Sequence, residues 1–253
     1  MIKKLNFRRV PKRFALLGSI VLLALGALLP VTAFAASAQQ PTKCGADDVK
    51  CVISAGDALI TKRLTDLKTL SSKIATDLSS HKITSDQASA LQSDVSSNQS
   101  GLTTLKTQLD AETVAKNARQ DAATIFTQYR IYAVVLPRDY RHLEMDIEIN
   151  AEAVMQKAAP AIKTAIGAAP ADKQKKLNSL YSDYEKQIAD AQSQITSAQN
   201  DFPALTVANF NQNHTSYEAT RLALDNALKA ARLDLHKAAG DIKDMTKILG
   251  IKA

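Results

Sequence analysis

The sequence of 253 residues contains 32 Lys and Arg against 25 Asp and Glu, but its positive charge is unevenly distributed. Six of the basic residues and none of the acidic ones lie within residues 1–38, which leaves the remaining chain with a net charge of +1. Nucleic-acid binding requires a concentrated basic surface on the folded domain, so the composition argues against nucleic acid as a partner.

Residues 1–38 have the three parts of an export signal. A basic region containing six Lys and Arg is followed by an uncharged stretch from Phe14 to Leu29 and then by Pro30. Two small-x-small patterns, at residues 33–35 and 36–38, are typical signal-peptidase cleavage sites. We therefore expect residues 1–38 to be a signal peptide and the protein to be secreted or located in the cell envelope.

A membrane anchor is the alternative interpretation of the same region. Residues 14–36 are uncharged and long enough to span a bilayer, with the basic residues remaining inside. Pro30 and the cleavage patterns favour removal. If the segment stays uncleaved, it is the only contact with a membrane that the sequence predicts.

Cys44 and Cys51 are the only cysteines and lie in a short lead-in over residues 39–52. In an exported protein such a pair indicates a disulfide. If residues 44–51 were one helix, the two Cα atoms would lie about 10.5 Å apart, too far for a disulfide. We expect a turn at Gly45, with Asp47 or Asp48 capping a helix that carries Cys51 in its first turn. Two free thiols are the alternative, and a metal site is less favoured because no His lies nearby.

After the lead-in, apolar residues that recur at spacings of three and four predict two helices. The seam of the first is Ile53, Ile60, Leu64, Leu67, Ile74 and Leu78. Thr84 and Gln87 form a capping box that begins the second. Its seam is Ala88, Leu91, Val95, Leu102, Leu105 and Leu109.

The pattern changes phase near residues 110–113, which predicts either a stutter in a long helix or a break capped by Asp110. It resumes with Ala118, Ala122, Ile125, Tyr129, Tyr132 and Leu136. Pro137 is expected to end or kink this helix. A further helix from about Asp139 carries Leu143, Ile147, Val154, Ala161 and Ile162, with a second kink at Pro160, and a turn follows at residues 167–170.

The last two helices are the most regular. Leu177, Tyr181, Tyr184, Ile188, Ala191, Ile195, Ala198 and Phe202 predict a helix over residues 171–202, ended by Pro203. A stripe from Tyr217 to Leu249 predicts another over residues 213–250. The sequence therefore predicts an all-α fold: an elongated antiparallel bundle of four or five long coiled-coil-like helices, forming one domain over residues 53–253.

The densest group of functional side chains lies beside Pro137. It consists of Tyr129, Arg130, Tyr132, Arg138, Tyr140, Arg141 and His142. Tyr and Arg are enriched at the centres of protein interfaces, so these residues are a candidate interaction patch. The alternative is structural, because Tyr129 and Tyr132 also lie on the predicted seam and the arginines can pair with acids.

No catalytic or metal-binding pattern emerges. Asp139, His142 and Asp146 share one helix face, but a di-metal bundle requires Glu-x-x-His on two helices, and the sequence contains no such pair. Neither a glycine-flanked nucleophilic serine nor a phosphate-binding loop is present. We therefore expect a protein that is not an enzyme and holds neither a cofactor nor a metal.

The segment Phe126-Thr127-Gln128-Tyr129-Arg130-Ile131-Tyr132-Ala133-Val134-Val135-Leu136-Pro137 resembles one found in uncharacterised exported helical proteins of bacteria. The resemblance implies a secreted or envelope helical protein and brings no known activity and no catalytic residues.

The expected function is contact with another protein or a cell-surface component, with self-association as an open alternative for the oligomeric state. Long seams without a catalytic group motivate this expectation. The alternative function is a carrier that holds a small apolar ligand or lipid between helices, for which the Ala-rich stretch 151–169 offers room.

Overall fold

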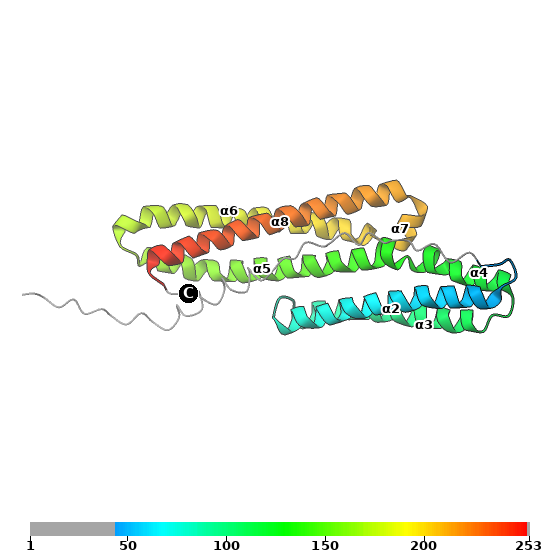
Figure 1. The fold of residues 1–253 in the computed structure, drawn as a ribbon. Helices are drawn as coiled ribbons and strands as arrows, with labels where there is room; N and C mark the ends of the chain where they lie inside the picture. Colours follow the sequence, from blue (N-terminus) through cyan, green and yellow to red (C-terminus); the bar gives the residue numbers. More distant parts are fainter. Residues whose placement is uncertain (1–43, 252–253) are drawn as a thin grey trace, which may run out of the picture. The chain divides into compact units, whose positions relative to one another are not determined.

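The computed structural model describes residues 44–251, and over these residues the protein is helical and contains no strand, which confirms the all-α helical bundle (Figure 1). The predicted signal peptide, its cleavage sites and the alternative anchor lie outside the described residues. No helix within the described part is long and apolar enough to cross a membrane. The elements in chain order are α2 (Val49–Ser79), α3 (Ser85–Asp110), α4 (Ala115–Thr124), the π-helical turns η2 (Ile125–Tyr129) and η3 (Ile131–Val135), α5 (Leu136–Gly167), α6 (Ala171–Asp201), the 3-10 turn η4 (Phe202–Ala204), α7 (Val207–Gln212) and α8 (His214–Leu249).

The described residues divide into two compact units. One unit comprises residues 151–193 and 230–251, and the other comprises residues 44–150 and 194–229. Helices α5, α6 and α8 contribute residues to both units. The single bundle domain expected over residues 53–253 stays a prediction.

The unit of residues 151–193 and 230–251 contains three helical segments around one apolar core. The seam predicted for residues 171–202 supplies its α6 side, where Leu177, Tyr184 and Ala191 are buried. Leu235, Ala238, Ile242 and Met245 of α8 and Met155, Ala158, Ile162 and Ile166 of α5 complete the core. The Tyr184 hydroxyl donates a hydrogen bond to the carbonyl of Met155, so the only polar atom of this buried side chain is satisfied.

In the other unit, α2 and α3 form an antiparallel pair joined by a tight turn. All six predicted seam residues of α3 are buried, and the capping box of Thr84 and Gln87 is present. The buried stripe of α2 also follows the three-and-four rhythm, but it passes through Arg63 and Asp77. Leu78, which the sequence places on the seam, is 37% exposed. The α2 seam is therefore shifted from the prediction and includes two charged side chains.

The turn between α2 and α3 is held by α5 of the same unit. His81 adopts a positive φ of 57°, and Asn150 donates to the carbonyls of His81 and Lys82 at 3.0 and 3.1 Å. The buried Asp77 pairs with Lys73 and Lys82 at 2.9 and 3.6 Å. These contacts satisfy the polar groups that a tight turn would otherwise leave unpaired.

At the predicted phase slip the helix is interrupted, and a short loop separates α3 from α4. Helix α3 ends at Asp110, which pairs with Lys106 at 2.8 Å, and α4 begins after Val114 without any side-chain cap. Of the two predicted alternatives the structure has the break and not the stutter, but Asp110 does not cap α4, because its carboxylate pairs with Lys106 within α3. Pro137 neither ends nor kinks a helix: it is the second residue of α5, where its missing N–H is harmless.

The interruption lies seven residues earlier, at Arg130. This residue has φ 40° and ψ 43°, in the left-handed region, and it separates the π-helical turns η2 and η3. Pro160 lies inside α5, and the short helix α7 was not predicted at all. Gly250 adopts φ 71° directly after α8, as expected for the residue that ends a helix.

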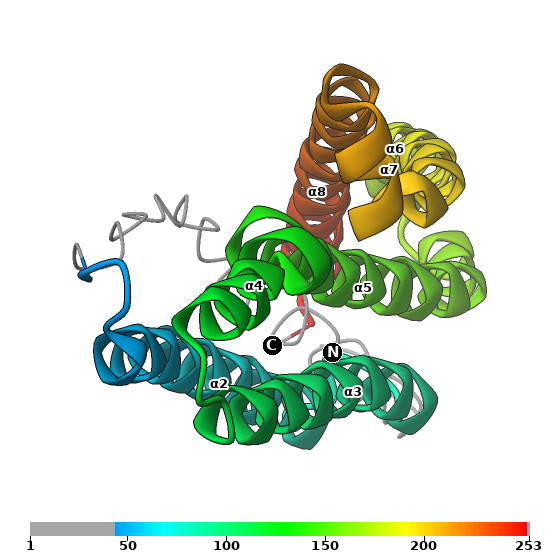
Figure 2. The ribbon, with the colours of Figure 1, turned by 90° about the vertical axis from the view of Figure 1, so that its right-hand side faces the viewer.

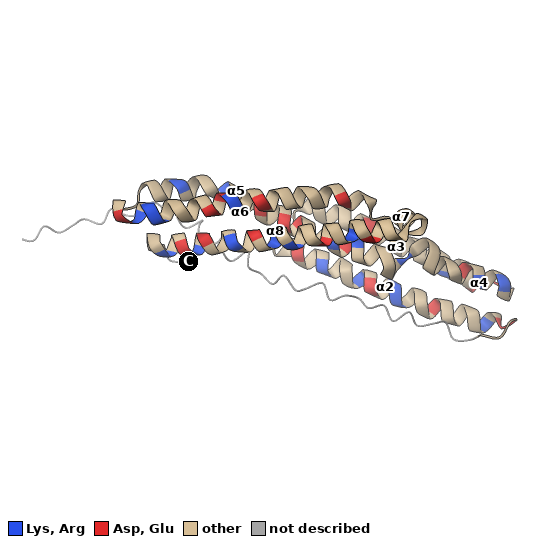
Figure 3. Ribbon diagram, turned by 90° about the horizontal axis from the view of Figure 1, so that it is seen from above, with Lys and Arg blue, Asp and Glu red and all other residues tan. Residues whose placement is uncertain are grey.

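Acidic and basic residues are interspersed along the helices (Figure 3). Ion pairs within single helices, such as Lys62–Asp66 and Arg221–Asp225, account for many of them. Because exposed pairs of this kind contribute little to stability, the fold depends mainly on its apolar seams.

Candidate functional site

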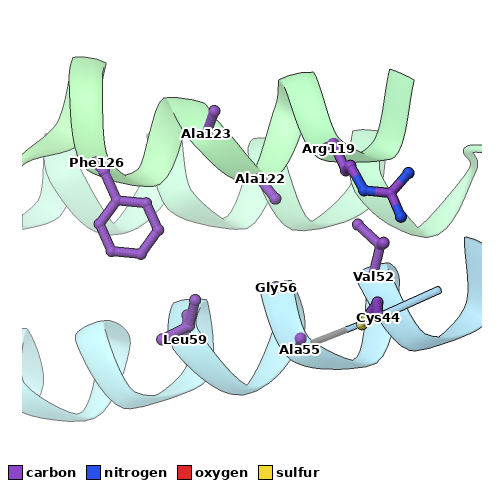
Figure 4. A pocket seen from close by; sticks show the side chains of 9 residues that line it. All are labelled: Cys44, Val52, Ala55, Gly56, Leu59, Arg119, Ala122, Ala123 and Phe126. Atoms are coloured by element: carbon purple, nitrogen blue, oxygen red, sulfur yellow. The ribbon is translucent and has the colours of Figure 1, made fainter. Parts of the chain in front are cut away.

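An apolar pocket of about 300 Å³ lies between α2 and α4 beside the disulfide. Its lining residues are Cys44, Val52, Ala55, Gly56, Leu59, Arg119, Ala122, Ala123 and Phe126 (Figure 4). Figure 2 shows the helices α2 and α4, and Figure 4 shows that the lining residues of α2 and those of α4 and η2 lie on opposite sides of the pocket. Eight of the nine residues are apolar, so a ligand of this pocket exchanges water mainly for hydrocarbon contacts.

Small side chains create the space. Ala55 and Gly56 on α2 lie opposite Ala122 and Ala123 on α4, and none of the four reaches far into the gap. At Gly56 a Cβ atom would lie 2.3 Å from Cδ2 of the buried Leu109, so any side chain here would force Leu109 of α3 to shift. α2 therefore forms one wall of the pocket, and α4 forms the other.

The disulfide forms one end of the pocket. Cys44 and Cys51 are bonded, with Cα atoms 5.7 Å apart, and the Asp48 side chain accepts a hydrogen bond from the Cys51 amide at 3.0 Å. The turn, the cap and the pairing were all predicted from the sequence. Arg119 of α4 donates to the carbonyls of Gly45 and Ala46, which ties the disulfide loop to the opposite wall.

Phe126 forms the other end and is 37% exposed. Its ring lies 5.1 Å from the guanidinium carbon of Arg63, which also lies 4.7 Å from the ring of Tyr132. Arg63 is 4% exposed and donates to the carbonyl of Leu59 at 2.9 Å. Burial lowers the pKa of Arg63, while Tyr132 and Asp66 oppose that shift. The two aromatic rings therefore stabilise a cation inside the seam of α2.

The predicted interaction patch is largely occupied by contacts within its own unit. The Tyr129 hydroxyl donates to the carbonyl of Gly101 at 2.8 Å, and the Tyr132 hydroxyl donates to Asp66 at 2.6 Å. Tyr140 packs against the core of the same unit, and burial raises its pKa. The three tyrosines thus anchor the segment to α2, α3 and the core.

Arg130 lies at the interruption between the π-helical turns η2 and η3. Its guanidinium lies 4.6 Å from the centre of the Phe210 ring and donates to Asn211, while Asn211 donates to the carbonyl of Thr127 at 2.9 Å. The unpredicted helix α7 therefore supports the left-handed residue that separates η2 from η3.

The two remaining arginines of the patch bind carboxylates. Arg138 lies 2.7 Å from Asp139 and 3.3 Å from Asp94. Arg141 makes a forked contact with both carboxylate oxygens of Asp225, and it donates to the carbonyl of Pro137 at 2.8 Å. These forked bonds fix the start of α5 against α8.

His142 lies against Phe202, with ring centres 4.5 Å apart, and its Nε2 is 3.9 Å from the carboxylate of Asp146. Burial lowers the pKa of His142. All seven patch residues lie in one unit, yet most of their polar groups are engaged internally. Their role in recognising a partner stays a prediction.

Sequence reasoning did not foresee that three carboxyl groups of α5 are buried, although Asp139 and Asp146 were noted on one helix face. Asp139, Asp146 and Glu148 are 0%, 5% and 1% exposed. Burial raises the pKa of each, to about 6 for Asp139 and Asp146 and to about 9 for Glu148. Arg138 opposes the shift at Asp139, and Gln87, which donates to Asp146 at 3.2 Å, opposes it there. No sequence signal separates these acids from surface ones.

Among residues 44–251 no group of three His, Cys, Asp or Glu is arranged to hold a metal ion. In comparisons with known proteins, no family model, no curated protein and no solved structure matches this chain.

Proposed function

We propose that this is an exported, non-enzymatic binding protein that holds a small apolar ligand in the pocket between α2 and α4. The observation that carries the proposal is the pocket itself, about 300 Å³ in volume and lined by eight apolar residues and one arginine. Ligand sites are usually concave, mostly apolar and already formed before binding, with volumes from about 300 Å³ upward.

The walls of the pocket support a preformed site. α2 is packed against α3 through Ile60, Leu67 and Leu109, which are fully buried. The loop before α2 is held by the disulfide and by Arg119. A ligand entering such a site loses less free energy to ordering the protein than one entering a flexible surface.

The disulfide is compatible with the proposed export, because such bonds persist in oxidising compartments outside the cytoplasm. As the alternative function, a carrier was expected to use the Ala-rich stretch 151–169, and that location stays a prediction. The pocket proposed here lies between α2 and α4, where alanines and a glycine from two helices face each other.

Calorimetric titration with octanol, an uncharged apolar probe, tests the proposal. Ala55 lines the pocket, whereas Ala58, one turn further along α2, is exposed. We expect Ala55→Phe to reduce octanol affinity at least tenfold because its ring fills the cavity, and Ala58→Phe to bind like the unmodified protein. Equal affinities in the two variants, or no binding to the unmodified protein, would refute the pocket as a ligand site.

A second candidate function is contact with another protein through the segment around η2. The observation that favours it is a run of exposed residues, Phe126, Thr127 and Gln128, just before the helix interruption at Arg130. Exposed aromatic residues are common anchors of protein interfaces.

Site-specific photo-crosslinking in the exporting host tests this second candidate. A crosslinker at position 128 should give a discrete adduct, and one at the exposed Ser72 should not. An adduct pattern that is the same at both positions argues against a dedicated interface at η2.

A further inference from the structure

We propose that the ligand of the α2–α4 pocket is a small apolar carboxylic acid whose carboxylate binds Arg119. The inference rests on the proposed function and names its ligand class. An aliphatic or aromatic body would occupy the space between the helices, and the acidic head would lie beside the guanidinium.

The pocket carries one positive charge. Arg119 is the single charged residue among the nine that line it. Its known acceptors are the uncharged carbonyls of Gly45 and Ala46, and no ion pair joins it to a described Asp or Glu. A guanidinium carries five N–H groups, so two carbonyl contacts leave donors for an anion. Its positive charge is therefore available to a ligand.

The two ends of the pocket differ in polarity. Arg119 lies at the end of the pocket near Cys44, and Phe126 lies at the opposite end, with Ala122 and Ala123 between them (Figure 4). Phe126 follows Arg119 by seven positions along the helix, a rise of about 10 Å. The pocket thus has one cationic end and one apolar end, as a ligand with a polar head and an apolar body requires.

A cationic ligand is disfavoured by the same geometry. An ammonium head beside Arg119 would repel it, and the described lining offers no carboxylate to compensate. An uncharged ligand would leave the guanidinium as it is, bound to two carbonyls. The charge complementarity therefore selects the acid among ligands with the same body.

Titration of the disulfide-bonded protein, exported and recovered from its host, with three probes of equal chain length tests the inference. Octanoate should bind roughly three- to tenfold more tightly than octanol, because a forked contact to a partly exposed arginine is modest in water. Octylammonium should bind more weakly than octanol. The preference for octanoate should shrink as salt is added, since the interaction lies near solvent.

Arg119 variants show whether this side chain is responsible. In Arg119→Gln, octanoate and octanol should bind equally, and Arg119→Lys should keep part of the preference because it keeps the charge. Lys116, exposed one turn earlier on α4, provides the matched control: Lys116→Gln should leave the preference unchanged. If Arg119→Gln loses both ligands because the loop loosens, the Arg119→Lys result decides, and a lost preference there overturns the inference.

The two proposals fail in different ways. Equal binding of octanoate and octanol to the unmodified protein overturns the acid as the ligand class and leaves the apolar pocket intact. Failure of all three probes overturns the carrier function together with the inference.

Discussion

Glu148→Gln should stabilise the protein at neutral pH, because the wild-type side chain has a carboxyl group where burial opposes its charge. Glu148 is 1% exposed, and burial raises its pKa from 4.5 to about 9. Between these two values the folded state binds more protons than the unfolded state. Stability therefore falls as pH rises through this window. Glutamine resembles the protonated acid and does not ionise, so the variant lacks this loss.

The size of the effect follows from the two pKa values. At pH 7 the unfolded glutamate is ionised and the folded one is still protonated. The difference from 4.5 to 7 corresponds to about 3 kcal/mol of stability lost by the wild type. For a chain of this size, that equals a rise of roughly 6–12 °C in the midpoint of thermal unfolding of the variant at pH 7. Near pH 4 the two proteins should unfold at the same temperature.

Thermal unfolding followed by circular dichroism, in steps from pH 4 to pH 7, measures this divergence. Glu112→Gln, in the half-exposed turn between α3 and α4, removes the same charge without the burial and should follow the wild type throughout. A Glu148→Gln variant whose midpoint differs from the wild type by a constant amount at every pH would show that ionisation of this carboxyl does not limit stability.

Three further changes test the packing. Gly101→Ala places a Cβ 2.6 Å from the Tyr129 ring and should lower the free energy of unfolding, measured in urea, by about 1–3 kcal/mol. Gly240→Ala meets nothing within 4 Å and should leave that free energy unchanged or raise it. Arg141→Ala should cost about 1–2 kcal/mol, because Asp225 keeps Arg221 at 2.7 Å as a second partner; no loss would mean the forked contact is absent in solution. Reducing the disulfide should cost about 2.5 kcal/mol and weaken octanol binding; unaltered binding would contradict a structural role for Cys44 in the pocket wall.

The regular helices could be predicted from the sequence because their apolar spacing is a local signal. In α6 the residues from Leu177 to Ala198 recur at three and four, and all seven are buried as expected. The capping box of Thr84 and the turn before Cys51 were also predictable, since each depends on residues within one or two turns of helix.

The α2 seam shows where the local signal is ambiguous. Arg63 and Asp77 are buried in it because distant groups compensate their charges: aromatic rings for Arg63 and two lysines for Asp77. The sequence offers Leu64 and Leu78 at neighbouring positions, which are better candidates by hydrophobicity alone. Burial of a charge is decided by tertiary partners that spacing does not reveal.

The pocket was not predictable for a related reason. Its lining comes from the start of α2 and from α4, which are separated by the whole of α3. Alanine and glycine at these positions are ordinary helix residues, and only the crossing of two helices makes them a cavity. An Ala-rich stretch of one helix, such as residues 151–167 of α5, encloses no space by itself, so composition alone does not locate a pocket.

The helix interruption at Arg130 explains why α4 takes the position that forms the pocket. A non-glycine residue in the left-handed region costs about 1–3 kcal/mol, and π-helical turns such as η2 and η3 are rare. The strain persists because Phe210 and Asn211 of α7 hold Arg130 and the carbonyl of Thr127. A continuous helix through this region would avoid the strain, but it would move Phe126 and the alanines of α4 relative to α2. The strained residue is therefore best explained by the position it imposes on the pocket wall.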